Sequence, residues 1–65
     1  MNEREKIGKR IAELRAEKRI SQVGLSEISG VGYSHIARIE LGKYNIRIDT
    51  LEKIAKAFDK KIDFV

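Results

Sequence analysis

Apolar residues recur at helical spacing in two stretches of this chain, and this periodicity limits the fold more than any other property of the sequence. Ile7, Ile11 and Leu14 follow at intervals of four and three residues, which places them on one face of an α-helix. A second stripe of this kind is formed by Leu51, Ile54, Ala55 and Phe58. A chain of 65 residues without cysteine has to build its core by packing such stripes together.

Capping residues and glycines mark where the helices begin and end. Asn2 and Glu5 resemble a capping pair, and Ser21 is a good N-cap residue. Gly30 and Gly42 stand where left-handed C-caps are expected. These signals predict three helices, over Glu3–Lys18, Gln22–Ser29 and Tyr33–Leu41.

The C-terminal third predicts one more helix and an ambiguous tail. Asp49 and Glu52 resemble a second capping pair, so a fourth helix is expected to start there, after a polar loop over Lys43–Ile48. Apolar and polar residues then alternate over Lys60–Val65, as in a short strand. A lone strand would leave its backbone groups unpaired. The tail is therefore either a strand that pairs with a second copy in a dimer or one turn of a fifth helix.

Composition excludes several classes of protein. The absence of cysteine rules out disulfides and thiolate metal sites, and no apolar run approaches the ~18 residues of a membrane span. The N-terminus lacks the features of a signal peptide, so we expect a cytoplasmic protein. Fourteen basic and ten acidic residues give a net charge of +4, and residues 1–19 alone hold seven basic and four acidic groups. This imbalance favours a polyanionic partner.

Two short helices joined by a glycine-bearing turn, within a small basic helical chain, form the helix-turn-helix arrangement. The run SQVGLSEISGVGYSHIARIELGK, residues 21–43, resembles the phage repressor and Cro class, the XRE-type family. The pair Leu14-Arg15 and the segment Thr50–Phe58 extend the resemblance to nearly the whole chain. It implies an all-α, lambda-repressor-like single domain over residues 1–65, with the motif at about 22–41, encoded by a bacterium or phage and associated with the nucleoid.

The third helix is the expected reading element. Leu25, Val31 and two isoleucines would hold the helix pair at a fixed angle, so that the third helix can enter the major groove. Arg38 is the strongest candidate for base recognition, because a bidentate contact with guanine discriminates by ~1–3 kcal/mol. The residues expected to contact bases are Tyr33, Ser34, Ala37 and Arg38.

Other positions are expected to serve the DNA backbone or the scaffold. Gln22, at the start of the second helix, is expected to bind a phosphate together with that helix's terminal amides, and the resemblance implies that it also supports the third helix. The resemblance further implies a partly buried ion pair between Arg15 and Glu40. The residues after the third helix that we expect to contact phosphates are Lys43, Tyr44, Asn45 and Arg47.

Five residues depart from the pattern of the resembling family. Gly32 stands where a Ser or Thr cap is usual. Gly24 lies inside the second helix, where it costs roughly 1 kcal/mol of helix propensity. Ile28 falls where a charged residue is usual, so either the helix is rotated locally or Ile28 is exposed for a partner. Ser29 replaces a small apolar residue, and Leu41 replaces a polar one.

No catalytic or metal-binding constellation is visible. His35 is the only histidine and has no clustered ligands, and its neighbour Ser34 would point about 100° away on a helix. We expect no enzyme, no metal and no cofactor. The predicted function is that of a sequence-specific regulator of transcription, most simply a homodimeric repressor bound to double-stranded DNA. The alternatives are an antitoxin, which binds DNA and a toxin, and a protein-interaction module that does not bind DNA.

Overall fold

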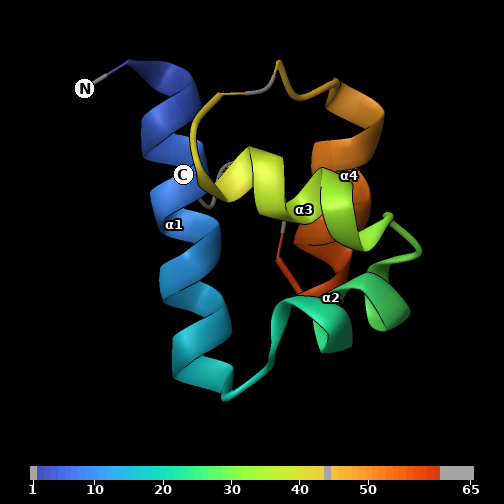
Figure 1. The fold of residues 1–65 in the computed structure, drawn as a ribbon. Helices are drawn as coiled ribbons and strands as arrows, with labels where there is room; N and C mark the ends of the chain where they lie inside the picture. Colours follow the sequence, from blue (N-terminus) through green and yellow to red (C-terminus); the bar gives the residue numbers. More distant parts are fainter. Residues whose placement is uncertain (1, 44, 61–65) are drawn as a thin grey trace.

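Four α-helices make up most of the computed structural model, which describes residues 2–43 and 45–60. In Figure 1, α3 runs across the front of the molecule, packed against α1 and α2, while α2 also packs against α4. The all-α fold predicted from the periodicity is confirmed. The helices are α1 (Glu3–Lys18), α2 (Gln22–Ser29), α3 (Tyr33–Glu40) and α4 (Ile48–Ala57).

The first two helices have the predicted bounds, and their caps explain why. The Asn2 side chain accepts a hydrogen bond from the backbone of Glu5 at 2.8 Å, and the Glu5 carboxylate accepts one from the backbone of Asn2 at 3.0 Å. This reciprocal capping box satisfies two N–H groups that α1 cannot. Ser21 accepts from the backbone of Gly24 at 2.9 Å, and Gly30 ends α2 with a φ of 77°.

The ends of the last two helices differ from the prediction. α3 stops one residue early, with Leu41 as its C-cap. α4 begins at Ile48, so the expectation that Asp49 caps this helix is wrong; the cap is Arg47, without a side-chain hydrogen bond. An acidic residue is favoured at the N-cap and also in the first turn, where it faces the positive end of the helix dipole. The sequence signal did not separate these two places.

Apolar side chains from all four helices meet in one core. Ile11 of α1, Leu25 of α2, Ile36 of α3 and Ile54 of α4 are all fully buried. Phe58, the C-cap of α4, is 1% exposed and closes the core from the C-terminal side. The tail predicted as a strand or a helical turn lies outside the described residues from position 61 onward, so both options stay predictions.

Two glycines let α1 and the end of α3 approach each other closely. A Cβ on Gly8 would lie 2.3 Å from the carbonyl oxygen of Ile39 and 2.9 Å from that of Glu40. A Cβ on Gly42 would meet the side chain of Glu5 at 2.8 Å, and its φ of 74° is one that L side chains rarely adopt. The contact between these helices therefore involves backbone atoms, which cannot move aside as a side chain can.

We expect Gly8→Ala to destabilise the fold by about 2 kcal/mol. Overpacking against rigid backbone costs about 3 kcal/mol, which exceeds the gain of about 1 kcal/mol in helix propensity. Urea unfolding followed by circular dichroism measures the difference. Gly32→Ser is the matched control, because no atom crowds that position. Equal unfolding midpoints for Gly8→Ala and the unchanged chain would contradict the close approach.

Candidate nucleic-acid interface

The turn between α2 and α3 sets the direction in which α3 leaves the motif. The Ser29 hydroxyl donates to the carbonyl oxygen of Leu25 at 2.7 Å and accepts from the backbone N–H of Val31 at 3.2 Å. Gly30 turns the chain in the left-handed conformation, and Val31 is buried beneath the turn. The serine that departs from the family pattern thus links the end of α2 to the chain entering α3.

One face of α3 is buried and the other carries the predicted reading residues. Ile36 and Ile39 anchor the helix in the core. Tyr33, Ser34 and Arg38 lie on the opposite side and are exposed, as their spacing along a helix requires. The fourth residue expected to contact bases, Ala37, is half-buried and therefore less accessible than the other three.

The loop after α3 carries exposed polar and basic groups. Gly42 turns the chain away from α3, and the loop then crosses to the start of α4 along the upper edge of the view in Figure 1. Lys43, Asn45 and Arg47 are exposed there. The predicted contact Tyr44 lies outside the described residues.

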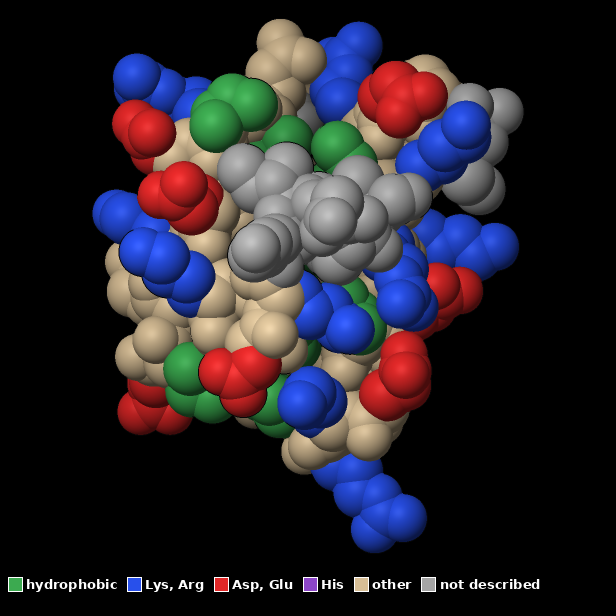
Figure 2. All heavy atoms as spheres, turned by 180° about the vertical axis from the view of Figure 1, so that it is seen from behind, with side chains coloured by type: hydrophobic (Ala, Val, Ile, Leu, Met, Phe, Trp, Pro, Cys, Tyr) green, Lys and Arg blue, Asp and Glu red, His purple; other side chains and the backbone are tan. Residues whose placement is uncertain are grey.

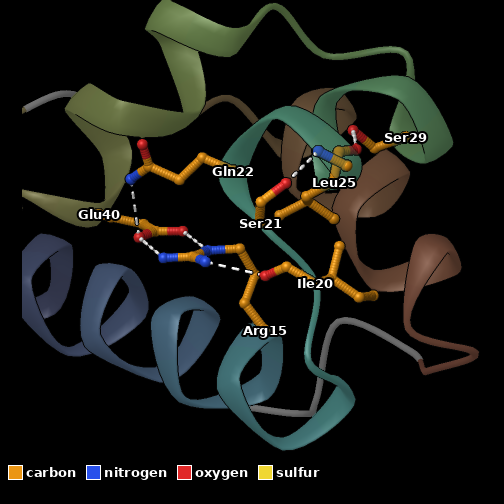
Figure 3. A network of polar contacts seen from close by, with 8 residues as sticks. Arg15, Ile20, Ser21, Gln22, Leu25, Ser29 and Glu40 are labelled. Carbon is orange, nitrogen blue, oxygen red and sulfur yellow. Dashed lines mark hydrogen bonds and ion pairs between the residues drawn. The ribbon is translucent and has the colours of Figure 1, made fainter.

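A single carboxylate, that of Glu40, joins α1, α2 and α3 (Figure 3). Glu40, at the end of α3, accepts from Arg15 of α1 through Nε at 2.6 Å and Nη2 at 2.9 Å. The same carboxylate accepts from the side-chain amide of Gln22, in α2, at 3.1 Å. The remaining guanidinium nitrogen of Arg15, Nη1, donates to the carbonyl oxygen of Ile20 at 2.9 Å. The network therefore fixes the start of α2 relative to the end of α3.

The ion pair also compensates the charge of Glu40. Hydrogen bonding to Glu40 raises the pKa of the Arg15 guanidinium, and the negative charge of Glu40 adds to this, while burial acts in the opposite direction. A raised arginine pKa adds stability at every pH below its ordinary value and loses it only above that range. Arg15 therefore stays charged at physiological pH. Between residues 30 and 48, Glu40 is the only acidic residue, and Arg15 compensates its charge.

The face opposite α3 has a different charge pattern. Figure 2 shows it from behind, with lysine and arginine side chains interspersed among aspartates and glutamates. Neither sign gathers into a single patch in that view. By contrast, α3 and the loop after it carry Arg38, Lys43 and Arg47 as exposed cations. The basic excess of α3 and the following loop comes from these three residues.

Sequence reasoning placed the reading helix but missed residues that hold it. Gly8 has no cap or turn role, and only the approach of the α3 backbone explains it. The sequence showed only that Gly24 lowers the helix propensity of α2. The structure explains why a glycine stands there, because a Cβ at this position would lie 2.9 Å from the side chain of Ile20. Ile28 is 59% exposed within a regular α2, so it is exposed rather than rotated into the core.

The described part of the chain shows neither a metal-binding cluster nor a membrane-spanning helix. Residues 2–43 and 45–60 contain no group of three potential metal-ligating side chains. Within these same ranges, no helix has the length and the apolar character required to cross a bilayer. His35 is half-buried in α3.

Comparison with known proteins gives the class. The chain belongs to the helix-turn-helix family HTH_3, whose pattern matches residues 11–65. The solved restriction-modification controller protein C.AhdI from Aeromonas hydrophila superposes with a TM-score of 0.90 at 33% identity, covering 94% of this chain and 92% of that one. A solved HTH_3 family transcriptional regulator from Vibrio cholerae, at 24% identity, shares the fold with a TM-score of 0.89 over 94% of this chain and 34% of its own.

Two curated relatives are similar in sequence. The immunity repressor protein of Bacillus phage phi105 is 34% identical over 59 residues, which is 91% of this chain and 41% of the repressor. The HTH-type transcriptional regulator PuuR of Escherichia coli (strain K12) is 39% identical over 51 residues, which is 78% of this chain and 28% of the regulator. The chain thus spans less than half the length of either relative. The family expected from residues 21–43 is confirmed.

We expect Arg15→Met to destabilise the protein by about 3–5 kcal/mol, because it leaves a carboxylate that is 8% exposed without its cation. Combining it with Glu40→Met should restore part of that loss. Lys6→Met is the control, since Lys6 pairs with Glu3 at 3.6 Å on an exposed face, and such pairs contribute about 0–1 kcal/mol. Urea unfolding of these three variants, of Glu40→Met alone and of the unchanged chain gives the coupling energy from a double-mutant cycle. An equal decrease in the free energy of unfolding for Arg15→Met and Lys6→Met would show that the Arg15–Glu40 network does not stabilise the fold.

Proposed function

We propose that this chain is a sequence-specific, double-stranded DNA-binding regulator of transcription. The observation that carries the proposal is the polar, exposed face of α3, with Arg38 at its centre, on a helix whose other face is locked in the core. An α-helix fits the width of the major groove, where base edges form a distinct pattern for each pair. Family membership and the relatives, which are named repressors and regulators, support the same function.

Each predicted contact has a role in this proposal. Arg38 and Ser34 read base edges, Tyr33 contacts a sugar, a phosphate or a thymine methyl, and Ala37 makes a small apolar contact. The backbone contacts are Gln22, Lys43, Tyr44, Asn45 and Arg47. Gln22 uses one amide hydrogen for Glu40, so its orientation is set before DNA arrives.

We further propose a homodimeric repressor that acts in the cytoplasm without a catalytic activity or a cofactor. Two copies related by a two-fold axis would place their α3 helices in successive major grooves about 34 Å apart. We propose that the copies pair through α4 and the segment 60–65. Truncation after Asp59 tests the pairing by sedimentation, and an unchanged molecular mass and DNA affinity would remove the tail from the interface.

Selection against random DNA duplexes, with sequencing of the bound fraction at near-physiological salt, tests the function directly. We expect an enriched palindrome whose half-sites lie about one helical turn apart, because the dimer presents two reading helices at that spacing. Binding should weaken steeply as salt rises, since phosphate contacts release counterions. Weak, salt-sensitive binding without an enriched sequence would contradict the proposal.

Substitutions on the selected site separate base reading from phosphate binding. Arg38→Ala should cost about 1–3 kcal/mol and relax the sequence preference at one base pair. Lys43→Ala should weaken all sequences alike and lower the salt slope by about 1. Lys18→Ala, at the end of α1, removes the same charge from an exposed position outside α3 and α4 and is the control. Titrations at several salt concentrations measure all three, and a uniform loss from Arg38→Ala would contradict its base-reading role.

A further inference from the structure

A surface groove lies between the end of α2 and the second half of α4. It has a volume of about 390 Å³ and is lined by Ile28, Ser29, Lys53, Lys56, Ala57 and Asp59. Ile28 is 59% exposed at its edge, and neither the core nor the proposed DNA contacts use it. A single exposed apolar side chain is ordinary on a protein surface, but Ile28 borders a hollow that also holds two lysines, so the surface offers a partner both an apolar and a charged contact.

The groove is separate from the proposed DNA contacts. Gln22 occupies the first turn of α2, whereas Ile28 and Ser29 lie in its last turn. The basic loop precedes α4, whereas Lys56 and Ala57 end that helix. In Figure 1 the loop crosses the top of the molecule and the end of α4 comes down beside α2. Both surfaces can therefore be occupied at once.

The charges at the rim of the groove indicate which kind of segment binds there. Lys53 and Lys56 are exposed, and among the described residues no ion pair involves either of them. With Asp59 included, the rim keeps one net positive charge. A second copy bound around a two-fold axis would bring the same lysines toward each other. The apolar part of the lining consists of one isoleucine and one alanine. Two such side chains cannot supply the ~800 Å² of surface that each partner buries in a stable interface.

We propose that this groove binds an acidic segment of another protein through one apolar anchor. The anchor side chain packs between Ile28 and Ala57, and carboxylates beside it pair with Lys53 and Lys56. Such binding leaves α3 free, so a DNA-bound copy could recruit the partner. The groove uses none of the proposed DNA contacts, and the proposal rests on the proposed function only in that copies pairing through α4 have to leave Lys53 and Lys56 accessible.

A library of random peptides of about twelve residues, displayed on phage and selected on the immobilised chain, tests the proposal. We expect enriched peptides to combine acidic residues with one bulky apolar residue. Synthetic copies, titrated into isotope-labelled protein, should shift the amide signals of Ser29, Lys56 and Ala57. The paired substitution Lys53→Glu and Lys56→Glu should weaken binding at least tenfold, as should Ile28→Gln, while Arg38→Ala should leave it unchanged.

Other results would overturn the proposal. Enrichment of no peptide family, or of peptides that bind the charge-reversed chain equally well, would remove the acidic partner. If the lysine substitutions instead convert a dimer to a monomer in sedimentation, the occupant is a second copy. Circular dichroism of each variant checks that its fold is intact. Loss of DNA binding is a different outcome and tests only the function of α3.

Discussion

The carboxylate of Glu40 is the point at which the helices of the motif are tied together. It receives two hydrogen bonds from Arg15 and one from Gln22, so α1, α2 and α3 share one partly buried anchor (Figure 3). Charge-assisted, bidentate contacts of this kind are directional as well as strong. Any rotation of α3 about its axis would break them, and the reading face is therefore held in one orientation. The same pairing compensates the only acidic residue between positions 30 and 48.

Backbone proximity makes that anchor geometrically attainable. Gly8 allows the carbonyl groups at the end of α3 to rest directly on α1, and Gly42 lets the chain turn past Glu5. A side chain at either place would push α3 outward and lengthen the contacts to Glu40. Close packing and the polar network thus depend on each other, because a hydrogen bond weakens steeply with distance and misalignment. The packed side of α3 is thus fixed against α1 and α2, while its opposite side stays exposed.

Much of this could be predicted because the relevant signals are local. The stripes ending in Leu14 and Phe58, and the caps at Asn2, Ser21 and Gly30, each act within a turn or two of helix. The start of α4 could not be located, since an aspartate suits both the cap and the first turn. The resemblance to a known family supplied the Arg15–Glu40 pairing. Periodicity alone would not have joined residues 25 positions apart.

The order of residues decided which segments become helices, where most of them end, and which face of each is apolar, because these properties depend on neighbours three or four positions away. Tertiary structure alone decided why Gly8 and Gly24 lack side chains and why Ser29 suits its turn. It also decided that Ile28 borders a groove with Lys53 and Lys56. These features arise where helices distant in the chain meet, and contact across space has no fixed spacing in sequence.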